Sequence, residues 1–581
     1  MTNLRPFLLG LFTALAGIGL YQFRSRIIAR LLHLSPPRYK ITVERNLPVP
    51  MRDGVILKAD HYAPNSPGSF PTLLIRSIYG RGTDMGPWGM GMGFPYARFA
   101  ERGYHVLVQT TRGMFDSGGE FKPVFHETED GLDTIAWIEE QPWFNGNLGM
   151  WGQSYLAHTQ WAVASKAPPS LKAIMPAVIS SEMHELSYTD GVPNIEITLR
   201  WIMILAGVRA LSPKGLRQPV EYRNLSRLIP ARQNRLLEKA LQKPLTQADK
   251  FLVGVKSDHF QNGLAHPNPT DPYWDPLHFR PRLSKVLAST YFFSGWYDMS
   301  LGGLLKDYAL LRAAGHIPYL TIGPWHHLDL SYTNECLREG LDWYESRLKG
   351  NHHNLRKKPV KIYVMGIEEW RELDTWPPAS TPTPYYLHPH AELGRSPVGG
   401  EHFPSVYHFD PTNPTPVSGG ARFSPDAGRE DQRAVESRPD VLTFTSSPLE
   451  HDLDVVGPVR ATLYVRSSLP HADFIARLCD VSTKGISTNL CDGIFRLAPG
   501  KGEPQPDGAL KIEVDMWASA NRFRKGHCIR LQIASAGYPR WALNPGTGES
   551  HATATRFLPA DQEIFHDETH PSMILLPIVK S

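Results

Sequence analysis

The sequence predicts an α/β domain that carries an inserted helical region and is followed by an all-β domain. Three patterns support this prediction: short apolar runs alternate with amphipathic stretches from about residue 41, helical patterns dominate residues 182–281, and period-two alternation dominates from about residue 355. A chain of 581 residues is too long for one ordinary core, and its length is typical of two to four domains.

The predicted α/β domain covers residues 41–181 and 282–354. Six apolar runs in it are the expected strands: Thr72–Arg76, Tyr104–Gln109, Leu148–Trp151, Leu171–Pro176, Tyr291–Ser294 and Tyr319–Ile322. Glu129–Glu140 precedes the third of these runs and places its apolar residues on one helical face. Strands separated by such helices form a mostly parallel sheet that helices cover.

Two further regions differ in periodicity from this domain. Residues 182–281 lack strand patterns and contain helical ones, such as Ile195–Leu211 and Leu236–Leu241, so we interpret them as a helical cap inserted between two strands of the sheet. From residue 355 to 581 apolar and polar residues alternate, as in Val459–Arg466. Strands that have one solvent-exposed face and no intervening helices indicate an antiparallel sandwich.

The N-terminal 40 residues have a different composition. The stretch Pro6–Phe23 is uncharged, is just long enough to span a bilayer, and has basic residues on both sides. It predicts an uncleaved membrane anchor, and the excess of basic residues after it places the catalytic domain on the cytoplasmic side. The alternative is a cleaved signal peptide and export, because Ala14-Leu15-Ala16 has the small-residue pattern of a cleavage site.

Composition and motifs argue against several classes of partner. The formal net charge is +4 and no Lys/Arg stripe is present, so we expect no nucleic-acid partner. The four cysteines show no metal-ligand spacing, and His388-Pro389-His390 has no carboxylate nearby, so we expect buried thiols and no metal. The glycine-rich stretch Gly86–Gly93 lacks the strand–loop–helix context of a phosphate loop, and no cofactor is expected.

The stretch Gly149–Ala157 (GMWGQSYLA) follows a predicted strand and precedes a helix, the context of a nucleophile elbow. Gly152 permits a sharp turn that lifts Ser154 to the C-terminal edge of the sheet. The backbone N–H of Tyr155 then points to the place where an oxyanion would form. Leu156 stands where the second glycine of Gly-x-Ser-x-Gly is expected, so a plain strand–helix turn is the alternative interpretation.

An activated serine needs a base, and the base needs a group that orients it. Asp298 and His327 each follow an apolar strand pattern, and the helical pattern Leu304–Ala313 lies between them. Their order after Ser154 is the order Ser, Asp, His that this class of elbow requires. The adjacent His326 leaves the choice of base open at this point.

Several stretches together match one known family. They are Met51-Arg52-Asp53-Gly54-Val55, Gly152-Gln153-Ser154-Tyr155, Gly295-Trp296-Tyr297-Asp298, Gly323-Pro324-Trp325-His326-His327, Asp440-Val441-Leu442, Gly457-Pro458-Val459 and Phe523-Arg524-Lys525-Gly526-His527. From about residue 41 to its end the chain resembles the cocaine-esterase and Xaa-Pro dipeptidyl-peptidase group of serine hydrolases, which includes α-amino-acid ester hydrolases and cephalosporin acylases. The resemblance implies an α/β-hydrolase domain with a helical cap and a C-terminal jelly roll.

The resemblance also implies the site residues. It places the nucleophile on Ser154, the acid on Asp298 and the histidine on the second position after Gly-Pro-Trp, which is His327 and not His326. It adds the hydroxyl of Tyr79 as an oxyanion donor beside the Tyr155 N–H. Two departures, Thr111 for an aspartate before Arg-Gly and Ala157 for a glycine after the elbow, leave this assignment intact.

The expected activity is hydrolysis of a small ester or amide through an acyl-enzyme. One alternative is a dipeptidyl peptidase that releases Xaa-Pro, which needs buried carboxylates for the substrate amine; Glu182, Glu185 and Asp190 are candidates. A second alternative, from another class, is a catalytically silent binding protein that keeps the fold.

Overall fold

The computed structural model describes residues 25–82, 87–212, 223–329 and 331–580. The predicted anchor Pro6–Phe23 lies outside these residues. None of the described helices combines the length and the hydrophobicity that a bilayer-spanning segment needs.

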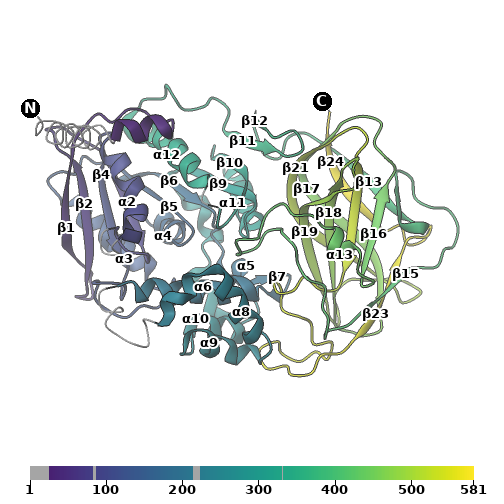
Figure 1. Ribbon diagram of the computed structural model, residues 1–581. Coiled ribbons are helices and arrows are strands. Elements are labelled where there is room, and N and C mark those ends of the chain that lie inside the picture. The colour runs from purple at the N-terminus through teal and green to yellow at the C-terminus, as the bar shows by residue number, and fades with distance from the viewer. Residues whose placement is uncertain (1–24, 83–86, 213–222, 330, 581) are drawn as a thin grey trace, which may run out of the picture.

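A ten-stranded sheet forms the first domain, with the spatial order β1-β2-β4-β3-β5-β6-β9-β10-β11-β12 (Figure 1). Its strands are β1 (Ile41–Pro50), β2 (Ile56–Pro64), β3 (Thr72–Ser77), β4 (His105–Thr110), β5 (Leu148–Gln153), β6 (Leu171–Ala177), β9 (Ser289–Tyr297), β10 (Tyr319–His326), β11 (Val360–Val364) and β12 (Glu369–Leu373). All neighbours from β4 to β11 pair in parallel, and the outer strands pair antiparallel. All six strands predicted from apolar runs are therefore confirmed.

Helices cover both faces of this sheet, which is why its central strands are apolar along their whole length. One face packs against α3 (Glu127–Glu139), α4 (Tyr155–Ala164) and α11 (Leu301–Ala313). The other face packs against α2 (Pro87–Ala100) and α12 (Ser331–Lys349). The C-terminal ends of the parallel strands all reach one edge of the sheet, and this edge positions the site described below.

The cap lies between β6 and β9 and is mostly helical, as predicted. It comprises α5 (Met183–Ser187), a hairpin of two short strands, β7 (Tyr188–Thr189) and β8 (Val192–Pro193), and the helices α6 (Ile195–Ala210), α8 (Pro230–Ala240), α9 (Leu245–Val253) and α10 (Asp258–Ala265). Helices α6, α8, α9 and α10 share a small apolar core. In Figure 1 the cap helices α6, α8, α9 and α10 lie below the sheet, at the lower edge of the view.

The second domain is built from β13 to β24 and is almost entirely antiparallel. Its longer strands are β13 (Thr381–His388), β16 (Val441–Ser446), β17 (Leu453–Ser467), β18 (Ala472–Val481), β19 (Ser487–Leu497), β21 (Leu510–Phe523), β22 (Cys528–Ala534), β23 (Ala560–Phe565) and β24 (Met573–Val579). On β17 the predicted alternation is present: Val459, Ala461 and Leu463 are buried, whereas Arg460 is exposed.

One segment differs from the sequence-based expectation. The sequence predicts that the second domain begins at residue 355, which would include β11 and β12. In the structure β11 pairs in parallel with β10, and both strands extend the first sheet. The alternating pattern of β11 would be the same in either sheet. Only its pairing with β10 determines to which sheet the strand belongs. The glycine-rich stretch Gly86–Gly93 lies from Pro87 onward inside α2.

Candidate active site

Ser154 occupies a strained position between β5 and α4. Its φ of 55° and ψ of −121° are rare for a residue with a side chain, and such strain is held only where the surrounding fold enforces it. Two residues earlier Gly152 has φ +148°, and a Cβ there would lie 2.4 Å from the Cβ of Leu156. Only glycine fits this turn, as the elbow motif predicted.

The structure brings Ser154, Asp298 and His327 together in one hydrogen-bonded row. Nε2 of His327 lies 2.9 Å from Oγ of Ser154, and Nδ1 lies 2.7 Å from Oδ2 of Asp298. Because a carboxylate only accepts, Nδ1 carries the ring hydrogen and Nε2 is free to accept the serine proton. The other oxygen of the fully buried Asp298 accepts the backbone N–H of Ser300 at 2.9 Å.

His326, the neighbouring candidate, faces away from this row. Its Nδ1 accepts a hydrogen bond from the backbone N–H of Leu328 at 3.3 Å. His326 is the last residue of β10, so His327, one position further, projects from the strand end toward the serine. The structure therefore places the second histidine of the pair against Ser154, at the position that the family motif indicated.

The strands that carry Asp298 and His327 approach each other unusually closely. A Cβ at Gly295, on β9, would lie 2.1 Å from the backbone carbonyl oxygen of Trp325, on β10. A Cβ at Gly323 would lie 2.2 Å from the Trp325 ring. Both glycines belong to the recognised motifs, and they are needed because this contact sets the spacing of the two strand ends.

Tyr155 has a backbone N–H that α4 does not use, because it is the first residue of the helix. Its side chain is held from two sides: the hydroxyl donates to Oε1 of Glu127 at 2.8 Å and accepts the backbone N–H of Val124 at 2.8 Å. Glu127 in turn pairs with the fully buried Arg76 at 2.6 Å. This buried row fixes the position of the Tyr155 side chain at the start of α4.

Tyr79 follows β3 and is largely buried beside the cap. Burial raises the pKa of its phenol, while a hydrogen bond from Trp201 on α6 lowers it.

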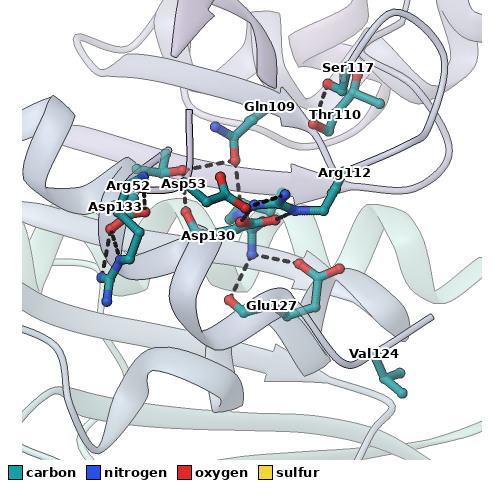
Figure 2. Close-up of polar contacts among 12 residues, drawn as sticks. Arg52, Asp53, Gln109, Thr110, Arg112, Ser117, Val124, Glu127, Asp130 and Asp133 are labelled. Atoms are coloured by element: carbon teal, nitrogen blue, oxygen red, sulfur yellow. Dashed lines mark hydrogen bonds and ion pairs between the residues drawn. The ribbon is translucent and has the colours of Figure 1, made fainter. Parts of the chain in front are cut away.

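A group of charged residues links the β1–β2 turn and the segment after β4 to helix α3 (Figure 2). Arg112, from the stretch with the unexpected threonine, binds both oxygens of Asp130 at 2.6 and 3.0 Å and Asp53 at 2.7 Å. Asp53 and the neighbouring Arg52, which binds Asp133 at 2.8 Å, belong to the first family motif. These motif residues therefore join β-strand loops to α3 and do not line the site.

A cavity opens beside Ser154, where the cap, the sheet edge and the β-rich domain meet. Its walls are mainly apolar and include Met183, Ile197 and Trp201 from the cap and Phe423 from the β-rich domain. The Phe423 ring packs edge-on against His327, with centroids 5.2 Å apart. None of the described residues that line this cavity carries a carboxylate.

The three carboxylates considered for amine capture are paired with other residues. Glu182 binds His278, and Asp190 binds the backbone N–H of Arg496 at 2.8 Å and Lys501 at 3.1 Å. Glu185 binds Arg280 through both oxygens at 2.7 Å. Although burial opposes its ionisation, Arg280 holds the pKa of Glu185 at about 2.

Trp201 and Phe423 are among the site residues that sequence reasoning missed. Their aromatic character gave no specific signal, because each reaches the site through packing between separate regions of the chain. Among the described residues, no group of three or more His, Cys, Asp or Glu side chains is arranged to hold a metal ion.

Comparisons with known proteins agree with this architecture. The family model for X-Pro dipeptidyl-peptidase (S15 family) matches residues 53–329, and that for the X-Pro dipeptidyl-peptidase C-terminal non-catalytic domain matches residues 351–575. The chain is 32% identical to the cocaine esterase of Rhodococcus sp. (strain MB1 Bresler), over 93% of this chain and 99% of that protein.

Two solved structures resemble the whole fold. An aminopeptidase from a marine sediment Thaumarchaeota archaeon has a TM-score of 0.78 at 21% identity, covering 94% of this chain and 98% of its own. An α-amino-acid ester hydrolase has a TM-score of 0.72 at 20% identity, with coverage of 94% and 98%. At these identities the likeness shows the shared fold.

Proposed function

This chain belongs to the X-Pro dipeptidyl-peptidase (S15) family of serine hydrolases, and we propose that Ser154, Asp298 and His327 are its catalytic triad. The observation that carries the proposal is the position of His327 between Asp298 and the Ser154 hydroxyl, with both contacts under 3 Å. His327 takes the proton of Ser154 as its oxygen attacks an ester or amide carbonyl. Asp298 keeps the imidazole in the required tautomer and stabilises its charged form.

The tetrahedral oxyanion is held by the Tyr155 N–H and the Tyr79 hydroxyl. Glu127 and Val124 hold the Tyr155 side chain in place before the substrate arrives. Preorganised donors stabilise the transition state more than the ground state. His327 then gives its proton to the leaving group, and water repeats the attack on the acyl-enzyme.

We further propose that the substrates are esters or amides of small, uncharged acyl groups, and not chiefly Xaa-Pro peptides. Capture of a free α-amine requires a well-placed, desolvated carboxylate. The described cavity walls contain none, and Glu182, Glu185 and Asp190 are bound to His278, Arg280 and Arg496. A mainly apolar wall is suited to an acyl chain or an aromatic ring.

Three substrates measured on one preparation test this preference: p-nitrophenyl butyrate, Ala-Pro-p-nitroanilide and the N-acetylated form of that dipeptide. An esterase should hydrolyse the butyrate best and should be nearly indifferent to acetylation, since it makes no ion pair with the amine. If the free dipeptide is the best substrate and acetylation lowers kcat/KM by more than about 100-fold, equivalent to about 2.7 kcal/mol, the peptidase function is correct instead.

A further inference from the structure

Two histidines outside the proposed triad line the cavity beside Ser154. His158 lies on α4, one helical turn after the serine, and is 2% exposed; His259 lies on α10 of the cap. The Nδ1 atoms of both rings are buried and have no hydrogen-bond partner among the described residues. Buried polar atoms are nearly always paired in folded proteins, so two unpaired ones on one cavity wall point to a ligand.

The hydrogen bond of the other ring nitrogen, Nε2, indicates what kind of partner Nδ1 of His158 could bind. Its Nε2 lies 3.4 Å from the backbone carbonyl oxygen of Val124. A carbonyl oxygen can only accept a hydrogen bond, so Nε2 carries the ring hydrogen and Nδ1 has a free lone pair. His158 therefore lines the cavity with an unpaired acceptor, and any partner of that acceptor must be a donor.

Both rings are neutral at physiological pH. Burial lowers the pKa of His158 to about 4 and that of His259 to about 4, and the nearby His259 ring further lowers the pKa of His158. His259 also packs edge-on against Trp201, with centroids 5.2 Å apart, which keeps its ring at the wall. A wall of this kind favours an uncharged polar group over a carboxylate.

We propose that His158 and His259 recognise a hydroxyl or amide N–H on the acyl part of the substrate, and that His158 accepts its hydrogen bond. This inference rests on the proposed function and narrows its substrate class. One helical turn separates His158 from Ser154, about 6 Å along the axis, so the donor stands a few bonds from the reacting carbonyl, as in a 3-hydroxyacyl group. A site with an unpaired buried acceptor rejects an acyl chain that has a methyl group in that place.

Paired esters with one leaving group test the proposal: p-nitrophenyl 3-hydroxybutyrate, as both enantiomers, and p-nitrophenyl 3-methylbutyrate. The two acyl groups differ by a hydroxyl in place of a methyl group of similar size. We expect wild-type kcat/KM to favour the better hydroxy enantiomer by at least about 10-fold, corrected for the uncatalysed rates. His158→Phe, which keeps the ring volume and removes the acceptor, should lower that preference by about 10-fold or more.

Three variants separate recognition from folding. His158→Asn retains an acceptor near the Nδ1 position and should keep most of the preference, and His259→Phe should reduce it. His184→Phe is the matched control, because His184 is also a buried histidine of the cap but donates to the Pro267 carbonyl at 2.9 Å and does not line the cavity. Its preference should equal that of the wild type.

The proposal is overturned if wild type prefers the methyl ester, or if His158→Phe and His158→Asn both leave the preference unchanged. A wild-type protein that hydrolyses simple esters but shows no preference contradicts this inference alone. A protein that cleaves no ester at all contradicts the proposed function, and this inference with it.

Discussion

At the scale of single residues, the site depends on which of two adjacent histidines faces the serine. The hydrogen bond between His327 and Ser154 is 2.9 Å long, whereas His326 accepts a hydrogen bond from the backbone N–H of Leu328. Neighbouring residues at a strand end point to opposite sides, so one position decides whether the ring can act as a base.

His327→Ala should therefore lower kcat by about 10⁶-fold, as loss of a triad histidine does in other serine hydrolases. His326→Ala removes a ring that makes no contact with Ser154 and should keep most of the activity. Steady-state kinetics on p-nitrophenyl butyrate for both variants provide the check. Inactive His326→Ala beside active His327→Ala would show that the assignment is off by one residue.

Sequence reasoning predicted the three triad positions because each follows an apolar strand, and parallel strands end at one edge. It could not choose between His326 and His327 without the family motif, since both follow the same strand. Trp201, Phe423 and His158 were not predicted, because their roles depend on how the cap and the β-rich domain pack over the edge.

At the scale of elements, the close contact between β9 and β10 sets the distance from Asp298 to His327. The contact exists because Gly295 has no side chain where the Trp325 carbonyl approaches it. A strand glycine is often a sign of such an approach.

Gly295→Ala should push the two strands apart and lower kcat by about 100-fold, because small misplacements of reacting groups have effects of this size. The same clash should reduce the free energy of unfolding by about 1–3 kcal/mol. Gly263→Ala on α10 is the control: its Cβ would meet nothing within 4 Å, and it should be as active as the wild type. Equal kcat for the two variants would refute the role given to this contact.

The helices and strands were more predictable than their assignment to domains. The alternating residues of β11 favour a strand whichever sheet it joins, so only the tertiary pairing with β10 places it in the first domain. Periodicity reports the burial of each face and carries no information about the partner strand.

At the scale of the whole molecule, a buried ion pair joins the cap to the β-rich domain. Glu196 on α6 binds the guanidinium of Arg422 at 2.7 and 2.9 Å, and Arg200 also contacts it at 3.0 Å. Each of these three residues is at most 3% exposed. Trp201 follows Arg200 and Phe423 follows Arg422, so this pair also positions two walls of the cavity.

Glu196→Gln should lower the free energy of unfolding by about 3–5 kcal/mol, because it leaves two buried guanidinium groups without their shared carboxylate. Arg422→Met should have a smaller effect, since Glu196 keeps Arg200. Urea titrations followed by tryptophan fluorescence compare the two variants. A larger loss of unfolding free energy in Arg422→Met than in Glu196→Gln would contradict this account of the ion pair between the cap and the β-rich domain.

The membrane anchor remains a proposal about the N-terminal 24 residues. Residues 25–40 pack on the first domain, where Ala29 and Leu34 are buried and Arg38 donates its backbone N–H to Glu101 at 2.8 Å. Deletion of residues 1–24 should therefore release the protein from membranes and preserve esterase activity. Full-length, uncleaved protein in the soluble fraction after cell lysis would contradict the anchor.

The central claim is that Ser154 is a nucleophile activated by His327, and a fluorophosphonate label tests it most directly, because only an activated serine reacts. Intact mass and peptide mapping should find one label on wild-type protein, at Ser154, and none on Ser154→Ala or His327→Ala. Wild-type protein that stays unlabelled would support the silent binding protein. A label on another residue, or labelling that persists in Ser154→Ala, would contradict the assignment of the nucleophile.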